Sequence, residues 1–202
     1  MVCACSWRTR DRLARASIVS VALMLRASCA VLAWLTLASA SAAQSDVKDF
    51  LKAVRLNDLT SVTAHISAGG DAQLTDRDGR SALHVAVRYG HNKLVVLLLD
   101  STRNVDQRDA DGWTALHHAA SMGDLVLTRQ LLEYGAHPNA TDEYHYGPLH
   151  LAAREGHYEV CEALVRAGAN PKATIDVGFT PADLAEQHPE LQDYLRALLL
   201  PQ

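Results

Sequence analysis

Residues 109–140 read DADGWTALHHAASMGDLVLTRQLLEYGAHPNA, and this stretch decides the fold. Asp111-Gly112 is a turn signal, and a short apolar run with two alanines follows it. Gly123 ends that run, and Gly135-Ala136 ends a second run that is rich in leucine. Apolar residues at helical spacing between turn residues predict two short helices joined by a turn.

The pattern of this stretch returns with a 33-residue period, as from Gly79 to Gly112. The turn glycines of the pattern are Gly79, Gly112 and Gly178, with His145 in the remaining place. The Leu-His pairs of the pattern are Leu83-His84, Leu116-His117 and Leu149-His150. A fixed period between about 20 and 50 residues is typical of a solenoid, in which stacked units share one core. At His145 the pattern predicts either another turn type or a left-handed residue other than glycine.

The chain resembles the ankyrin repeat family at these positions. The family's signature, T-P-L-H-x-A, appears as Ser81-Ala-Leu-His-Val-Ala86, Thr114-Ala-Leu-His-His-Ala119, Gly147-Pro-Leu-His-Leu-Ala152 and, in a worn copy, Thr180-Pro-Ala-Asp-Leu-Ala185. The resemblance covers roughly residues 46 to 200. It implies an all-α solenoid of stacked helix-turn-helix units with β-hairpin-like tips. Its motifs are specific to this fold but not to any one activity.

Five units are expected in the repeat region. Residues 44–75 form an N-terminal cap, residues 76–108, 109–141 and 142–174 form three central units, and residues 175–202 form a C-terminal cap. The last helix is expected from Leu191 to Leu200, with Pro201 ending it. The segment Asp100–Val105 replaces the Gly-Ala closure of the second unit, which leaves its turn geometry open.

The charge of the chain depends on which part is counted. Of 19 basic and 23 acidic residues, five basic and one acidic residue precede Gln44, which leaves 14 and 22 and a net charge of −8. A domain with this charge repels nucleic acid and anionic lipid, so neither is an expected partner. Cys161 is the only cysteine after residue 43, which rules out a disulfide within the repeat region. Its apolar neighbours predict a half-buried, inert thiol.

Residues 1–43 have the composition of a secretory signal. The apolar run 27–38 follows Arg26 and precedes a tract of small residues with a cleavage-site pattern at Ala40 and Ala42. Cleavage near Ala43 would leave the repeat region in a bacterial periplasm or outside the cell, without stable membrane association. Residues 24–43 would form a compact signal by themselves, so Met24 is an alternative start. An uncleaved, signal-anchored membrane protein is the alternative for localisation, although Arg26 interrupts a continuous span.

All ten histidines lie after residue 43. In the ankyrin family the signature histidine binds neighbouring hairpins through both ring nitrogens, which implies this role for His84, His117 and His150. A metal site on His117, His118 and His145, in a metal-binding or stress-related envelope protein, is the alternative. No cysteine or carboxylate stands near these three at the spacing of a metal ligand, so no metal or other cofactor is expected.

Three repeated acidic residues, Asp76, Asp109 and Asp142, resemble candidates for general acid–base chemistry. Their 33-residue spacing favours another interpretation, in which each accepts backbone hydrogen bonds in its own turn. The sequence contains no nucleophile elbow, P-loop or paired-carboxylate signature. We therefore expect no catalytic residue in this chain.

The residues that follow the turn glycines form a column of their own, made of Arg80, Trp113, Tyr146 and Phe179. In the family, hairpin tips and the outer positions of the first helices line a concave face that binds partners. Around the column this face would include Tyr89, His118, Met122, Tyr144 and Arg154. Aromatic residues and arginine are typical anchors of protein interfaces. The alternative is that each tip aromatic packs on its neighbouring hairpin and shields the turn.

These features together predict a non-catalytic protein-binding module. A monomer would present its preformed concave face to a periplasmic or secreted protein and would protect, inhibit or assemble that partner. The negative charge of the repeat region favours a partner with a basic patch.

Overall fold

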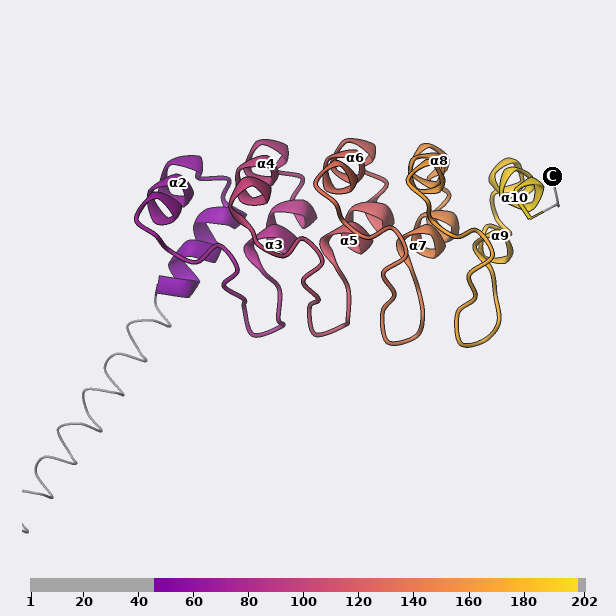
Figure 1. Cartoon of the computed structure of the whole chain (residues 1–202), viewed down its shortest axis with the longest axis horizontal. Coiled ribbons are helices and arrows are strands. Elements are labelled where there is room, and N and C mark those ends of the chain that lie inside the picture. The colour runs from indigo at the N-terminus through magenta and orange to yellow at the C-terminus, as the bar shows by residue number, and fades with distance from the viewer. Residues whose placement is uncertain (1–45, 200–202) are drawn as a thin grey trace, which may run out of the picture. The chain divides into compact units, whose positions relative to one another are not determined.

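The computed structural model describes residues 46–199, which fold into a row of helix pairs (Figure 1). Helical residues 46–55 are followed by α2 (Leu59–Ser67), α3 (Ala82–Arg88), α4 (Asn92–Ser101), α5 (Ala115–Met122), α6 (Leu125–Glu133), α7 (Pro148–Glu155), α8 (Tyr158–Arg166), α9 (Pro181–Leu184) and α10 (Pro189–Ala197). No strand occurs in this part of the chain, so the prediction of an all-α repeat solenoid is confirmed. The predicted signal segment, residues 1–43, lies outside the described residues.

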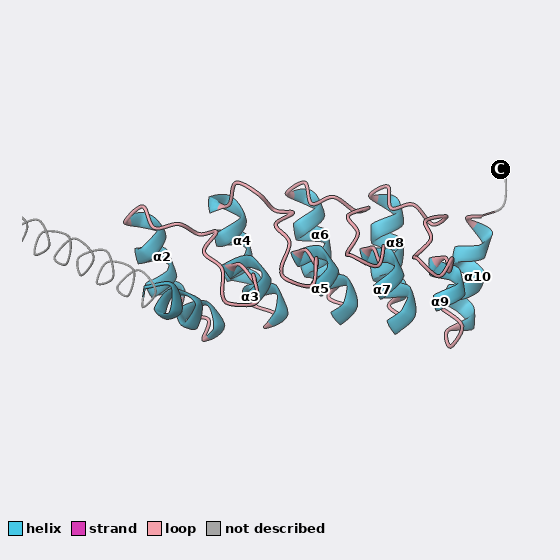
Figure 2. Cartoon of the chain, turned by 90° about the horizontal axis from the view of Figure 1, so that it is seen from below, coloured by secondary structure: helices cyan, strands magenta, loops and turns pink. Residues whose placement is uncertain are grey.

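The helices form two layers. The first helix of each pair contacts the first helix of the next pair, so that α3, α5, α7 and α9 make one row (Figures 1 and 2). The second helices α2, α4, α6 and α8 make the other row, and α10 packs on α9. Each unit therefore buries its apolar face against its own partner helix and against the neighbouring units.

The core follows the repeat pattern. Leu94 and Leu127 of the second helices and Leu116 of a first helix are fully buried, and burying one such side chain contributes about 1.5–3 kcal/mol. One alanine column is also fully buried, and it consists of Ala86, Ala119, Ala152 and Ala185. Small residues at these positions let neighbouring first helices approach closely, which explains why this column contains only alanine.

The loops between the pairs end in narrow tips that project to one side of the helices (Figure 1). Each tip is closed by a backbone hydrogen bond, such as that from Asp109 N to Trp113 O at 2.9 Å. Gly112 adopts a left-handed φ of 78°, which glycine accepts without steric cost. In the next unit His145 adopts φ 63° at the same position. The left-handed alternative at His145 is therefore confirmed, and the turn type is retained.

Three local expectations need correction or completion. The last helix, α10, runs from Pro189 to Ala197 rather than from Leu191 to Leu200, because proline suits the first helical position, and Pro201 lies outside the described residues. The second unit has no closing glycine, so α4 continues to Ser101 and the chain then becomes extended at Thr102. The prediction that Cys161 is half-buried is wrong: it is fully buried, in the column of core residues that includes Val95.

The helices between residues 46 and 199 are short, and none combines the length and apolar character that a membrane span requires.

Candidate protein-binding site

The tips are held in shape by aspartate side chains. Oδ1 of Asp109 accepts hydrogen bonds from the backbone N–H groups of Asp111 at 3.0 Å and Trp113 at 2.9 Å. Asp142 repeats these bonds with Tyr144 and Tyr146 at 2.9 and 2.8 Å. Asp76 does the same in the preceding tip. The predicted turn role of the three aspartates is confirmed, and it fixes the backbone from which the tip side chains project.

The signature histidines His84 and His117 tie the two central tips to the units before them. Nδ1 of His117 accepts the backbone N–H of Thr114 at 3.1 Å, and Nε2 donates to the carbonyl of Tyr146 at 3.1 Å. His84 makes the same two contacts with Ser81 and Trp113. A carbonyl oxygen can only accept, so Nε2 carries a proton. Because Nδ1 accepts a backbone N–H, it carries none, and the ring is neutral. The expected use of both ring nitrogens is therefore confirmed.

Burial keeps these imidazoles neutral. It lowers the pKa of His117 to about 4, and the backbone hydrogen bond to Tyr146 opposes this effect only in part. Burial also lowers the pKa of His84 and of His150, whose Nε2 donates to the carbonyl of Ala173. In the last unit Asp183 replaces the histidine and caps α9 by accepting hydrogen bonds from Thr180.

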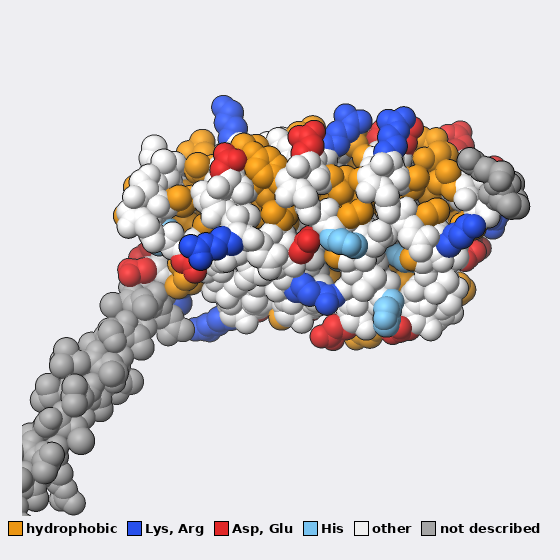
Figure 3. All heavy atoms as spheres, in the orientation of Figure 1, with side chains coloured by type: hydrophobic (Ala, Val, Ile, Leu, Met, Phe, Trp, Pro, Cys, Tyr) orange, Lys and Arg blue, Asp and Glu red, His pale blue; other side chains and the backbone are white. Residues whose placement is uncertain are grey.

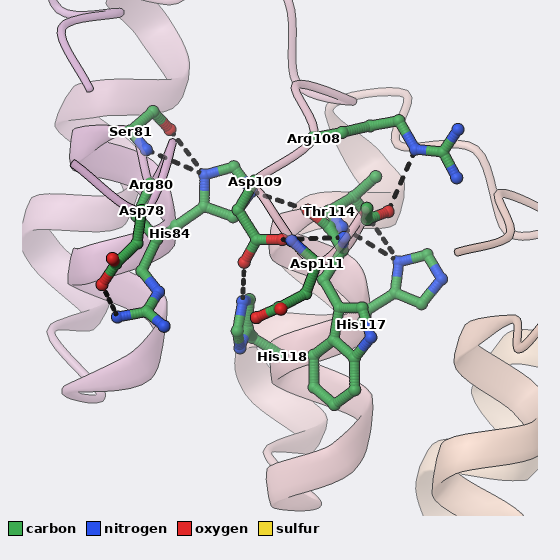
Figure 4. A network of polar contacts seen from close by, with 12 residues as sticks. Asp78, Arg80, Ser81, His84, Arg108, Asp109, Asp111, Thr114, His117 and His118 are labelled. Carbon is green, nitrogen blue, oxygen red and sulfur yellow. Dashed lines mark hydrogen bonds and ion pairs between the residues drawn. The ribbon is translucent and has the colours of Figure 1, made fainter. Parts of the chain in front are cut away.

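A buried pair stands beside the histidines (Figure 4). Nε2 of His118 lies 3.0 Å from Oδ2 of Asp109, with the two side chains 12% and 1% exposed. Burial lowers the pKa of His118, and the carboxylate opposes this. Burial raises the pKa of Asp109, but hydrogen bonds from His118 and from the Trp113 amide outweigh this effect, so the pKa is lowered overall. A neutral His118 therefore donates to a charged Asp109.

His118 and His145 each contact one carboxylate that is not near them at metal-ligand spacing in the sequence. Turns bring Asp109 to His118, and the next unit's tip brings Asp176 to His145, with 2.6 Å between Nδ1 and Oδ1. Each is a pair, however, and a metal site in a protein uses at least three side-chain ligands in most cases. Among residues 46–199 no three His, Cys, Asp or Glu side chains are placed so that they could hold one metal ion. The metal alternative thus lacks a ligand set in the described part of the chain.

The tips and the first helices enclose a hollow of about 630 Å³, which we call the groove. Of the nine residues predicted to bind a partner, the groove is lined by Arg80, Trp113, His118, Met122, Tyr144, Tyr146 and Arg154. The other two, Tyr89 and Phe179, lie outside it, and each is 51% exposed. The structure therefore brings seven of the predicted side chains to one place, whereas binding itself remains a prediction.

A comparison with protein families matches the description "Ankyrin repeats (3 copies)" to residues 50–142 and 105–175, which together span more than half of the chain. The chain belongs to the ankyrin repeat family. A comparison with curated proteins finds no match. Ankyrin repeats are protein–protein interaction modules, so membership indicates this general role.

The aromatic column of this ankyrin domain does not stack ring on ring. The Trp113 indole N–H donates to Oδ2 of Asp142 in the next tip at 3.2 Å, and its ring centroid lies 5.0 Å from that of His118. The Tyr146 ring lies under the guanidinium of Arg154, 5.9 Å from its carbon. Within residues 46–199 no ring contact joins two members of the column, because each ring turns to other partners.

For Trp113, the alternative of packing on the neighbouring tip is therefore correct, although its ring also lines the groove. Several residues that line the groove were not predicted from the sequence, among them Arg88, Glu143 and Leu151. A signal for Arg88 was present, since it stands two ankyrin periods before Arg154 in the sequence.

Proposed function

We propose that this chain is a non-catalytic module that binds a protein partner through the groove, in a bacterial periplasm or outside the cell. The observation that carries the proposal is the gathering of aromatic, arginine and methionine side chains in one hollow. Residues of these types are the usual anchors of protein interfaces, where their burial provides most of the binding energy.

The rigidity of the groove supports this proposal. Each of the two central tips is braced internally by an aspartate and externally by a histidine of the preceding unit. Neighbouring tips are also joined, for example by the bond from Ala110 N to Asp78 O at 2.9 Å. Because the backbone is already ordered, docking a partner loses little conformational entropy, and this leaves more of the contact energy for affinity.

The proposed location rests on the composition of residues 1–43, which lie outside the described residues. The full chain should therefore be expressed with a C-terminal affinity tag, so that any processing of the leader is preserved. The mass of the purified protein then tests cleavage near Ala43. A mass that includes the leader, together with membrane fractionation, would favour the signal-anchored alternative.

A pull-down from envelope extract and culture medium tests binding. The groove variant changes two lining residues, Met122→Ser and Tyr144→Ser, together with Tyr89→Ser next to the lining residue Arg88, because these side chains are exposed and their loss costs little stability. Trp113 is left intact, since its indole also holds the neighbouring tip. The matched control is Val126→Ser in α6, Tyr134→Ser at the C-terminal cap of α6 and Tyr158→Ser at the start of α8.

The control residues are 39–52% exposed, against 42–65% for the groove residues, so the two variants lose similar apolar surface. On the face shown in Figure 3, the second helices present charged side chains with hydrophobic ones between them. We expect a protein retained by the native chain and by the control, with affinity at least about tenfold weaker for the groove variant. Equal retention by both variants would place the contact elsewhere and refute the role of the groove.

A further inference from the structure

Arg88 and Arg154, at the carboxyl ends of two first helices, line the groove and make that edge basic. Arg55, Arg88 and Arg154 occupy the same position of the repeat, with Ser121 between the last two, and all three arginines are exposed. Among the described residues, Arg55 and Arg88 form no ion pair. Arg154 pairs only with the adjacent Glu155, at 3.0 Å, and the two side chains stay 45% and 43% exposed. We call these positions the helix rim.

The opposite edge of the groove is acidic. The two central tips contribute Asp111 and Glu143, both exposed, both lining the groove, and neither in an ion pair among residues 46–199. Two other charged side chains of the groove, Asp142 and Arg80, already have partners within the chain. Asp142 accepts the Trp113 indole, and Arg80 lies 3.1 Å from Asp78. Arg77 stands on an earlier tip and does not line the groove. We call Asp111 and Glu143 the tip rim.

Exposed apolar side chains, which we call the apolar stripe, accompany both rims. On the helix side it consists of Leu56, Tyr89 and Met122, which repeat at 33-residue steps. On the tip side it continues through Tyr144, Val177 and Phe179. These six are most of the nine large exposed hydrophobic residues in the described part of the chain. Since the stripe residues recur in successive units, which follow one another along the solenoid (Figure 2), a single compact side chain could not cover them.

We infer that the partner presents an elongated segment with an apolar centre, acidic side chains along the edge that faces the helix rim, and basic side chains along the edge that faces the tip rim. This inference rests on the proposed function of the groove. It differs from the expectation based on net charge, because charges farther away than about 8 Å are largely screened at physiological salt. The local arginines and carboxylates, rather than the total of −8, then decide which partner charges fit.

The test uses a display library of randomised peptides, selected on the tagged full chain. Two charge-reversal variants are selected in parallel, one with Arg88→Glu and Arg154→Glu, the other with Asp111→Lys and Glu143→Lys. A matched control carries Lys93→Glu and Arg129→Glu on the second helices, which are exposed and far from the groove in the repeat pattern. All positions are exposed, and circular dichroism checks that every variant is folded.

Peptides enriched on the native chain should combine apolar residues with both acidic and basic residues. The helix-rim variant should reduce the enrichment of acidic residues and retain that of basic ones, and the tip-rim variant should do the reverse. For a synthetic peptide from the native selection, we expect each reversal to raise Kd about tenfold and the control to leave it unchanged. Enrichment of basic residues alone, or equal Kd on all variants, would overturn the inference.

The groove variant shows whether a negative result contradicts only the charge pattern or also the proposed function of the groove. If the selected peptides bind the Tyr89→Ser, Met122→Ser, Tyr144→Ser variant as well as the native chain, or if no peptide is enriched, both the proposed function and the charge pattern are contradicted. If that variant loses the peptides while both charge reversals keep them, the groove binds protein segments but the charge pattern is wrong.

Discussion

Replacing Gly147 with serine should stabilise the folded chain. Gly147 precedes α7 at φ −99° and ψ 171°, an extended conformation that any residue adopts. Ser81 and Thr114 occupy the same place in the two preceding units, and each hydroxyl lies 2.8 Å from Nδ1 of its signature histidine. In the fourth unit His150 Nδ1 meets only the backbone N–H of Gly147, at 3.1 Å. The fourth unit therefore lacks a hydrogen bond that its neighbours have.

The size of the effect follows from two contributions. Removing glycine restricts the unfolded chain and stabilises by about 0.4–1 kcal/mol. A new hydrogen bond from the hydroxyl to His150 adds about 1 kcal/mol. A Cβ on residue 147 would lie 3.3 Å from the carbonyl oxygen of Ala140, which is a tight contact, but a small hollow of about 240 Å³ beside Gly147 gives room for adjustment. The net expectation is about 1.5 kcal/mol, or about 4 °C in Tm for a domain of this size.

Urea and thermal unfolding followed by circular dichroism measure this difference. Gly147→Ala is the matched control, because it adds the Cβ without the hydroxyl and should gain only about 0.5 kcal/mol. Thr114→Gly should lose about as much stability as Gly147→Ser gains. If serine is no more stable than alanine at position 147, the hydroxyl does not bind His150. If both are less stable than the native chain, the contact with Ala140 outweighs the gain, and the reasoning fails.

Three further predictions concern other positions. Because burial lowers the pKa of His117 from 6.5 to about 4, the unfolded chain binds a proton in this range that the folded chain does not. Protonation of His117 in the unfolded chain should therefore lower the free energy of unfolding by up to about 1.4 kcal/mol per pH unit as the pH falls from 6.5 to 4. Urea titrations that give the same stability across this pH range would contradict the prediction. Thr128→Val should stabilise by about 1 kcal/mol, since the buried Thr128 hydroxyl has no hydrogen-bond partner and earlier units have valine in this column; a lower Tm would indicate an unseen partner. His145→Gly should raise stability by about 1 kcal/mol by relieving the left-handed conformation, unless the exposed pair with Asp176 contributes more, which a decrease in Tm would reveal.

The features that could be predicted from the sequence are those in which one residue type performs one local task in every unit. A left-handed turn selects glycine at Gly112, a tight loop selects the carboxylate of Asp109, and a bridge between units selects the imidazole of His117. Because each task recurs once in every repeat, the period confirms each assignment independently of the others. The histidine at position 145 fits the same logic, since the backbone demand stays when the preferred residue is missing.

Contacts between two different columns could not be predicted in this way. The Trp113 indole reaches Asp142, and His118 reaches Asp109, but the period alone does not specify how far one column lies from another. The ring orientations on the groove depend on these contacts, and the column of tip residues alone does not specify them. Arg88 is different, because its column was visible in the sequence, and only its place on the rim of the groove required the structure.

The histidine bridge also determines how such a chain can grow. The bonds from His84 to Trp113 and from His117 to Tyr146 both span 29 residues, so each joins a histidine to the tip of the next central unit, whereas His150 bonds Ala173 instead. A tandem duplication of residues 109–141 would supply every new bridge with a donor and a carbonyl. The same duplication after the last unit would find Asp183 instead, which caps its own helix and offers no ring to a following tip. Units can thus be added inside the array but not at its end. An inserted unit would lengthen the groove, and with it the partner segment that the groove can hold, without changing the width of the groove.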